Sequence, residues 1–144
     1  MHASIRAVLT GALIGSVAVV GAFGLLVLVG QIPKAPFAAQ WQTLFGGDWR
    51  TGVLLGGLAF VAIGTLWGLP FAAVPHPTVP KAMAWAIVPT LWALAGWPAV
   101  QGTPLFADGD PAGVLIPIVM NIVVWGSLLG WYARRSLSTR SPMA

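Results

Sequence analysis

Long apolar stretches without a charged side chain, separated by short polar segments, dominate the pattern of the chain. Four such stretches follow one another, at about residues 7–30, 51–74, 82–100 and 112–133. A helix that rises 1.5 Å per residue needs about 20 apolar residues to cross a hydrocarbon core of about 30 Å. The pattern therefore predicts an all-α membrane protein, with residues 1–144 folded as one domain around a bundle of four transmembrane helices.

Two of these stretches allow other interpretations. The first could be a signal peptide, but its apolar run exceeds the usual 7–15 residues and no convincing cleavage site follows, so we interpret it as an uncleaved span. The third is the weakest, because Pro89 should kink it and Pro98 should end it, and a re-entrant segment is the alternative. The polar residues 136–144 are predicted to form a loose tail.

A different periodicity marks the connection between the first two spans. Within residues 37–46, the side chains of Phe37, Trp41, Leu44 and Phe45 recur at helical spacing, while polar residues fall between them. This pattern predicts a short amphipathic helix that lies in the membrane interface with its aromatic side towards the lipid. Anchoring is the preferred role for this segment, and ligand binding is the alternative.

Glycines recur at four-residue steps inside the spans. Each costs roughly 1 kcal/mol in a helix in water, but in a bilayer such steps let two helices approach closely. We expect eight glycines to pack helices together: Gly11, Gly15, Gly52, Gly56, Gly64, Gly68, Gly126 and Gly130. The Gly52–Gly68 series forms one ridge with Phe60, and the glycines of the first span are its expected partner.

Composition excludes a soluble domain. Hydrophobic residues make up 58% of the chain and charged residues 7%, against about 25% in an average soluble protein. The net charge of +4 comes from scattered cations beside the spans, which is typical of membrane topology and not of nucleic-acid binding. One side of the membrane would carry Arg6, Lys81, Arg134, Arg135 and Arg140, and the other would carry Lys34 and Arg50. This asymmetry places both termini in the cytoplasm.

Few residues offer chemistry. No acid, base or histidine lies inside a span, which argues against ion-coupled transport. Asn121 is the one strongly polar residue at depth, with Trp125 one turn later, and either an inter-helix hydrogen bond or a polar ligand group would satisfy it. His76 stands in a proline-rich loop, where solvation is a better explanation than ligation. The sequence predicts no catalytic residue, metal site or cofactor.

The two halves of the chain show a faint likeness. The second span contains Leu66-Trp67-Gly68 and the fourth contains Val124-Trp125-Gly126. These short matches hint at two related hairpins.

The segment from Asn121 to Tyr132, together with the glycine ridge of the second span, resembles a loose set of uncharacterised bacterial four-span inner-membrane proteins. The second and fourth helices of that set carry small-xxx-small steps next to aromatic residues. A histidine is common there at the position of Asn121. The resemblance covers about Gly52 to Arg135 and implies the fold without an activity.

Two functions suit these observations. The first is a non-catalytic accessory or assembly subunit of a larger membrane complex, or a homo-oligomer, packed through glycine-lined and tryptophan-rich faces. The alternative is a small facilitator or binder of an apolar or neutral solute, lipid, quinone or pigment. The expected partners are the bilayer and other membrane subunits or further copies of the chain, and not nucleic acid.

Overall fold

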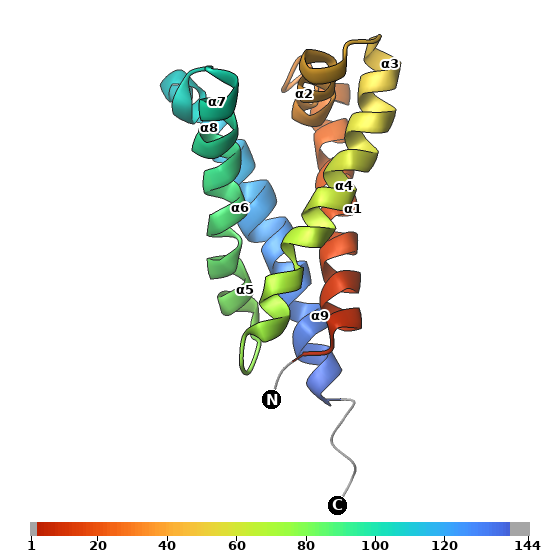
Figure 1. Cartoon of the computed structure of the whole chain (residues 1–144), viewed down its shortest axis with the longest axis vertical. Helices are drawn as coiled ribbons and strands as arrows, with labels where there is room; N and C mark the ends of the chain where they lie inside the picture. Colours follow the sequence, from red (N-terminus) through yellow and green to blue (C-terminus); the bar gives the residue numbers. More distant parts are fainter. Residues whose placement is uncertain (1–2, 139–144) are drawn as a thin grey trace, which may run out of the picture.

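The computed structural model describes residues 3–138, which fold into helices joined by short loops (Figure 1). Four helical segments are long and apolar enough to cross a membrane: Ile5–Leu28, Trp49–Ala73, Val79–Gln101 and Pro111–Leu137. The prediction of an all-α chain with four candidate spans is therefore confirmed. The last helix runs to Ser138, so residues 136–138 are helical instead of loose, and the rest of the expected tail lies outside the described residues.

Only the first span is a single regular α-helix, and the other three contain irregular turns. The first is α1 (Ile5–Leu28). The second comprises α3 (Trp49–Thr51), η1 (Gly52–Gly56), α4 (Gly57–Trp67) and η2 (Leu69–Ala73). The third comprises α5 (Val79–Trp85), α6 (Ile87–Leu91), η3 (Trp92–Gly96) and α7 (Trp97–Gln101). The fourth comprises α8 (Pro111–Ile118), η5 (Val119–Trp125) and α9 (Gly126–Ser138). Two short helices lie in connections: α2 (Pro36–Phe45) and η4 (Leu105–Gly109).

Short polar side chains cap the start of each span. The backbone N–H of Ala7 donates to the Ser4 hydroxyl at 3.2 Å, and that of Gly113 donates to the Asp110 carboxylate at 2.7 Å. Asp48 and Thr78 cap the second and third spans in the same way. These bonds satisfy backbone donors that the first helical turn leaves free.

Helix α1 holds the molecule together. It packs against α4 on one side and against η5 and α9 on the other, and α9 in turn packs against α5. The helices converge at the end of the molecule where α1 begins and α9 ends (Figure 1). Towards the opposite end they separate into two arms, one formed by α1, α2 and α4 and the other by α6, α7 and α8 (Figure 1).

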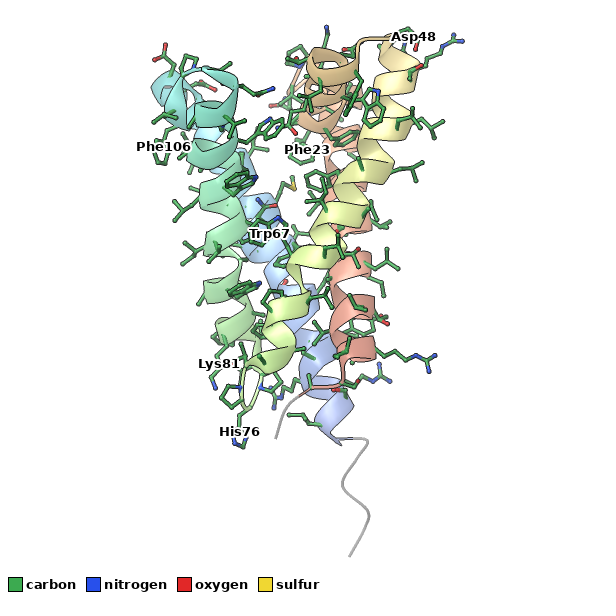
Figure 2. The ribbon with its side chains drawn as sticks, viewed as in Figure 1. Phe23, Asp48, Trp67, His76, Lys81 and Phe106 are labelled. Atoms are coloured by element: carbon green, nitrogen blue, oxygen red, sulfur yellow. The ribbon has the colours of Figure 1, made fainter. Side chains whose placement is uncertain are left out.

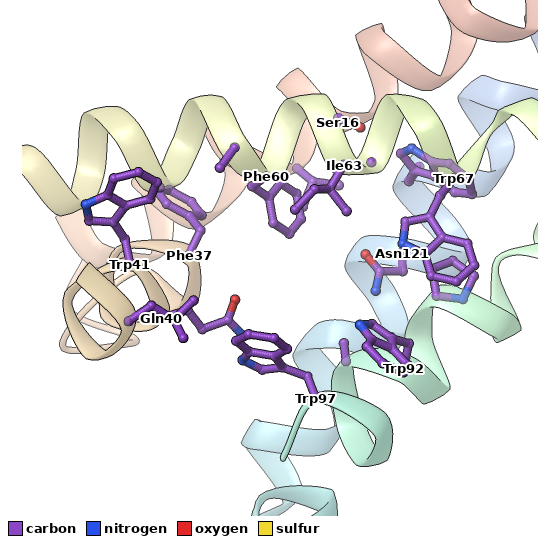
Figure 3. A pocket seen from close by; sticks show the side chains of 18 of the residues that line it. Ser16, Phe37, Gln40, Trp41, Phe60, Ile63, Trp67, Trp92, Trp97 and Asn121 are labelled. Atoms are coloured by element: carbon purple, nitrogen blue, oxygen red, sulfur yellow. The ribbon is translucent and has the colours of Figure 1, made fainter. Parts of the chain in front are cut away.

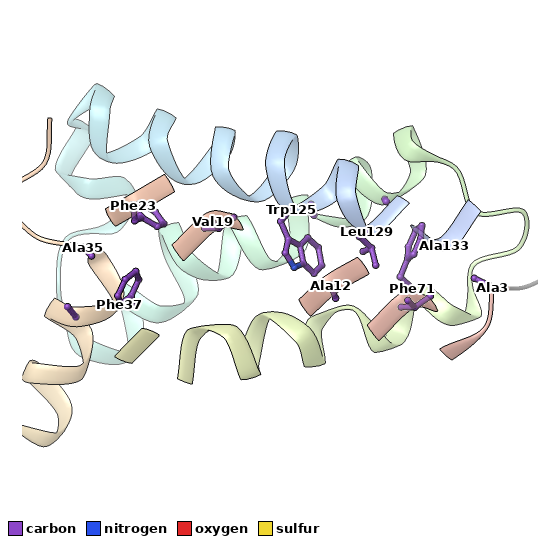
Figure 4. Packing of buried hydrophobic residues seen from close by; sticks show 14 residues of the cluster. Ala3, Ala12, Val19, Phe23, Ala35, Phe37, Phe71, Trp125, Leu129 and Ala133 are labelled. Carbon is purple, nitrogen blue, oxygen red and sulfur yellow. The ribbon is translucent and has the colours of Figure 1, made fainter. Parts of the chain in front are cut away.

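The core lies along α1 and is deepest at the convergent end. Val8 and Ala12 of α1, Leu129 of α9 and Phe71 of η2 are fully buried there (Figure 4). Large apolar side chains also cover the outside of the spans, among them Leu13, Leu54, Leu58, Leu66 and Leu115. Such a surface suits lipid as the surrounding solvent.

The glycines of the first span face the fourth span. A Cβ atom on Gly11 would lie 2.8 Å from Tyr132 Cβ, and one on Gly15 would lie 2.9 Å from Trp125 Cδ1. The expectation that these glycines meet the glycine ridge of the second span is therefore wrong. The first and fourth helices approach closely because neither Gly11 nor Gly15 has a side chain to separate α1 from the larger residues of the fourth span.

The ridge of the second span divides between two partners. Its first two glycines face α2. A Cβ atom on Gly52 would lie 2.9 Å from the carbonyl oxygen of Ala38, and Gly56 lies against the carbonyl oxygen of Phe37. Further along, Gly64 faces the Ser16 hydroxyl of α1, and a Cβ atom on Gly68 would lie 2.5 Å from Ala12 Cβ.

Between these two pairs, Phe60 closes a cluster of three aromatic rings. Its ring centroid lies 6.5 Å from that of Phe23 in α1 and 5.9 Å from that of Phe37 in α2. The cluster holds the start of α2 against the first two spans.

The last two predicted packing glycines face the third span. A Cβ atom added to Gly126 would lie 3.0 Å from Met83 Cα, and one added to Gly130 would lie 2.6 Å from Val79 Cα. Backbone therefore lies against backbone where α5 meets α9.

Candidate functional site

The two separating arms enclose a cavity of about 570 Å³ (Figure 3). The second span forms one wall, the third span forms the facing wall, and η5 of the fourth span lies behind them (Figure 3). Helix α2 borders the outer end through its aromatic side. The lining residues are Ser16, Val19, Phe37, Gln40, Trp41, Leu44, Phe45, Gly56, Ala59, Phe60, Ile63, Gly64, Trp67, Pro89, Trp92, Ala93, Trp97, Asn121 and Trp125.

The wall is aromatic and carries no charged side chain. It includes five of the eight tryptophans of the chain and three of its six phenylalanines. Polar side chains come from Ser16, Gln40 and Asn121. The Ser16 hydroxyl donates to the carbonyl oxygen of Ala12 at 2.8 Å within its own helix. A mainly apolar wall with a few polar groups is the usual composition of a small-molecule site.

All three π-helical turns contribute to this cavity. Gly56 comes from η1, Trp92 and Ala93 from η3, and Asn121 and Trp125 from η5. A π turn widens the helix by one residue and changes the direction of its side chains, and such turns are frequent at functional sites. Pro89 and Pro98 flank η3, where the missing proline N–H groups favour local rearrangement of the helix.

Asn121 lies at the back of the cavity, between the two arms (Figure 3). Its side-chain amide forms no hydrogen bond with any residue between 3 and 138, including those of the neighbouring helices. The amide therefore has free donor and acceptor positions at membrane depth.

Trp125 lies one turn beyond Asn121 and is 4% exposed. Its indole N–H is buried and unpartnered within the described part of the chain, as is that of Trp97. By contrast, the indole N–H of Trp85 donates to the carbonyl oxygen of Trp67 at 3.0 Å and ties the third span to the second. The structure thus brings the predicted pair Asn121 and Trp125 together and adds a second unpartnered donor.

His76 belongs to a different region. It is exposed in the loop between the second and third spans, at the convergent end of the molecule (Figure 2). Its backbone has a φ of 48°, and its carbonyl oxygen accepts from Lys81 Nζ at 3.1 Å. The structure does not bring His76 to the cavity.

The acidic residues lie near the opposite end: Asp48 precedes α3 (Figure 2), and Asp108 and Asp110 come directly before α8. The backbone N–H of Thr51, assisted by its hydroxyl, donates to Asp48 and lowers the pKa of that carboxyl from its ordinary value. Within residues 3–138, no three His, Cys, Asp or Glu side chains come together as a metal site would require.

The sequence did not single out most of the tryptophans of the cavity as site residues, and the aromatic side of α2, for which anchoring was the preferred role, borders the cavity. Trp67, Trp92 and Trp97 fall on the inner faces of two helices that belong to different arms. Hydropathy cannot reveal those faces in membrane helices, because the lipid side is equally apolar. One signal was available, since Trp67 and Trp125 occupy matching places in the two hairpins and both line the cavity.

Fold and site together define an all-helical chain with four candidate membrane-spanning helices and an uncharged aromatic cavity between its arms. No protein-family model, no curated protein and no solved structure matches this chain.

Proposed function

We propose that this chain is a multi-pass membrane protein that binds an apolar, uncharged molecule in the cavity between its arms and does not catalyse a reaction. The observation that carries the proposal is the cavity itself. About 570 Å³ lies in the middle of the range of roughly 300–1,000 Å³ typical of small-molecule sites. Its uncharged wall offers no compensation for an ionic ligand, which would be costly to desolvate at this depth.

The volume also distinguishes a small molecule from a neighbouring helix. A spanning helix about 30 Å long and 10 Å wide occupies roughly 2,400 Å³, whereas all the space between the arms that atoms do not fill amounts to about 1510 Å³. A quinone, a pigment or one chain of a lipid needs far less space. The cavity therefore favours the binder among the two functions suggested by the sequence.

The accessory-subunit hypothesis depended on tryptophan-rich faces and on glycine-lined faces that neighbours could use. Each of the eight glycines has its close contacts within this chain, on α1, α2, α5, η5 or α9. The glycine-lined faces are therefore already occupied inside the protein. Assembly with other membrane proteins or with further copies remains a prediction that needs a different surface.

A bacterial inner membrane with cytoplasmic termini is part of the proposal. Arg6, Lys81, Arg134 and Arg135 lie at the convergent end. At the opposite end, Lys34 follows the first span and Arg50 lies in the first turn of the second span. The Arg135 guanidinium sits 5.2 Å from the ring centroid of Trp131, a pairing typical of the headgroup region. The convergent end carries more cations than the opposite end, and this excess favours the cytoplasmic side of the membrane for the convergent end.

The test is recovery of the bound molecule. The chain is purified in mild detergent and extracted with organic solvent, and the extract is analysed by mass spectrometry against a detergent blank. We expect one apolar species in stoichiometric excess over bulk lipid. A double variant, Ala59→Phe with Ala93→Phe, places two rings inside the cavity and should lose that species.

The matched control is Ala62→Phe, three residues along the same helix as Ala59 but exposed on the lipid side. This variant should retain the molecule. Equal recovery from the filled and control variants, or no species above bulk lipid, would contradict ligand binding. A stoichiometric protein that copurifies in place of a small molecule would restore the accessory-subunit hypothesis.

A further inference from the structure

Two unpartnered indole donors in one apolar cavity limit the chemistry of its occupant. Trp125 of η5 and Trp97 of α7 both line the cavity, and the N–H of each is buried without a partner in the described residues. Native structures leave very few buried donors unpaired, since each costs roughly 1–3 kcal/mol. Trp85, whose N–H reaches a carbonyl oxygen of the chain, shows that this fold can pair an indole when an acceptor is near.

The surroundings of Trp125 place its indole nitrogen beside the inner end of the cavity. The ring lies against Gly15 of α1, where a Cβ atom would be 2.9 Å from Cδ1. On its nitrogen side, a Cβ atom on Gly64 would be 3.9 Å from Nε1, and Gly64 itself lines the cavity. The Ser16 hydroxyl lies where a Gly64 side chain would begin, so the glycine leaves room for this hydroxyl and for the indole nitrogen beside it.

From this arrangement we propose that the bound molecule is neutral, apolar over most of its length and anchored by a carbonyl oxygen that accepts from the Trp125 indole N–H. The inference rests on the proposed function and narrows it. An indole N–H only donates, so the ligand must supply an acceptor. A charged acceptor is disfavoured, because none of the lining residues is a cation.

The remaining polar groups serve the same ligand. The Asn121 amide, one turn before Trp125, can donate to the same oxygen or to a second one. Trp97, towards the outer end of the cavity, offers a donor to a second acceptor of the same molecule. The flat faces of Trp67 and Trp92 lie on opposite walls beside Asn121 (Figure 3), where a planar conjugated group could stack.

Quinones and ester-linked lipids are two common membrane sources of a carbonyl oxygen in an apolar molecule. Three probes separate them: a benzoquinone with a ten-carbon tail, an alkylbenzene with the same tail and no oxygen, and a short-chain diacylglycerol. Each is titrated into the full-length protein in detergent after the copurified molecule has been exchanged out. Binding is followed by the indole N–H resonances in ¹H–¹⁵N spectra and by the dissociation constant.

We expect a carbonyl probe to shift the Trp125 indole resonance downfield and to bind about tenfold more tightly than the alkylbenzene. Trp125→Phe keeps an aromatic ring but removes the donor, and it should weaken carbonyl binding about tenfold while leaving alkylbenzene binding unchanged. Trp131→Phe, outside the cavity, is the matched control. Tighter binding of the quinone or of the diacylglycerol identifies the source, and either supports the proposal.

The spectral titration uses the unaltered chain, so the inference can be tested even if Trp125→Phe does not fold. Equal affinity for the alkylbenzene and both carbonyl probes, or a Trp125 resonance that does not move on saturation, would overturn the carbonyl anchor and leave apolar binding intact. Failure of all three probes, together with no difference between the cavity-filled and control variants, would overturn the proposed function itself.

Discussion

The convergent and separated ends of this protein are built from the same helices but from side chains of different size. Where the helices meet, Gly11, Gly68 and Gly130 lie against Tyr132, Ala12 and Val79 at distances that a single Cβ atom would make too short. Where they part, tryptophans and phenylalanines project into the space between them. The contrast shows how side-chain volume along a membrane helix sets the distance to its neighbour.

The physical reason is that apolar burial alone does not drive helices together in lipid. Association there depends on close packing and inter-helix hydrogen bonds, so small residues decide where backbones meet. At the other end, bulky rings line the walls of the arms, and a space remains there for another molecule. One end therefore provides the stability of the fold, and the other provides the proposed site.

Removing a large ring from each end gives the greatest expected contrast. Phe71 is fully buried at the convergent end, whereas Trp92 is 47% exposed on the cavity wall. Phe71→Ala should lower the free energy of unfolding by about 3–5 kcal/mol, because packing cannot close the space. Trp92→Ala should cost less than about 1 kcal/mol. Denaturant titration in micelles measures both, and similar losses would remove the distinction between the ends.

Enlarging a glycine tests the close approach directly. Gly130→Leu forces a side chain against the backbone of Val79 and should lower the free energy of unfolding by about 3 kcal/mol. Gly21→Leu is the control, because nothing lies within 4 Å of a Cβ atom there and the residue is exposed. Thermal unfolding of both variants should show a large loss only for Gly130. If Gly130→Leu unfolded at the temperature of the unaltered protein, backbone packing of α5 on α9 would be refuted.

The hydrogen bond between Trp85 and Trp67 should contribute less to the free energy of unfolding than either of these packing contacts. Trp85→Phe removes the indole N–H that donates to the carbonyl oxygen of Trp67, and it should cost about 0.5–1.5 kcal/mol. This hydrogen bond joins α4 to α5 next to the cavity. Its loss in the variant should therefore let the two arms fluctuate more. Spin labels on α4 and α6 would report a broader distance distribution. An unchanged distribution would mean that the bond does not restrain the arms.

The smallest effect concerns Asp48, outside the spans at the separated end. Its pKa is lowered in the folded chain by the donors of Thr51, so its stabilising effect is present above the ordinary value of 3.8 and is lost as the pH falls through the lowered pKa. The Thr51 amide resonance should therefore titrate with a midpoint below 3.8. Asp48→Asn retains the cap and should abolish the titration. A midpoint at or above the ordinary value would show that the cap does not hold the carboxylate.

Local features of the chain were predictable where a single physical rule decides them. The spans follow from apolar length, and the cap at Asp110 with Pro111 in the first turn follows from the backbone groups that a helix start leaves free. The small steps at Gly64 and Gly68 likewise indicated close packing. Asn121 and Trp125 stood out because a polar group at depth needs a partner.

What the sequence by itself determined was therefore the class of protein, the number of candidate spans and the positions able to pack closely. Only the tertiary structure decided which helices meet, that Gly11 faces Tyr132 and not the second span, and that Trp97 and Trp125 face one cavity. The reason is that lipid and protein interiors are equally apolar, so hydropathy does not distinguish the inner face of a membrane helix from its outer face. The assignment of faces comes from packing between segments far apart in the chain.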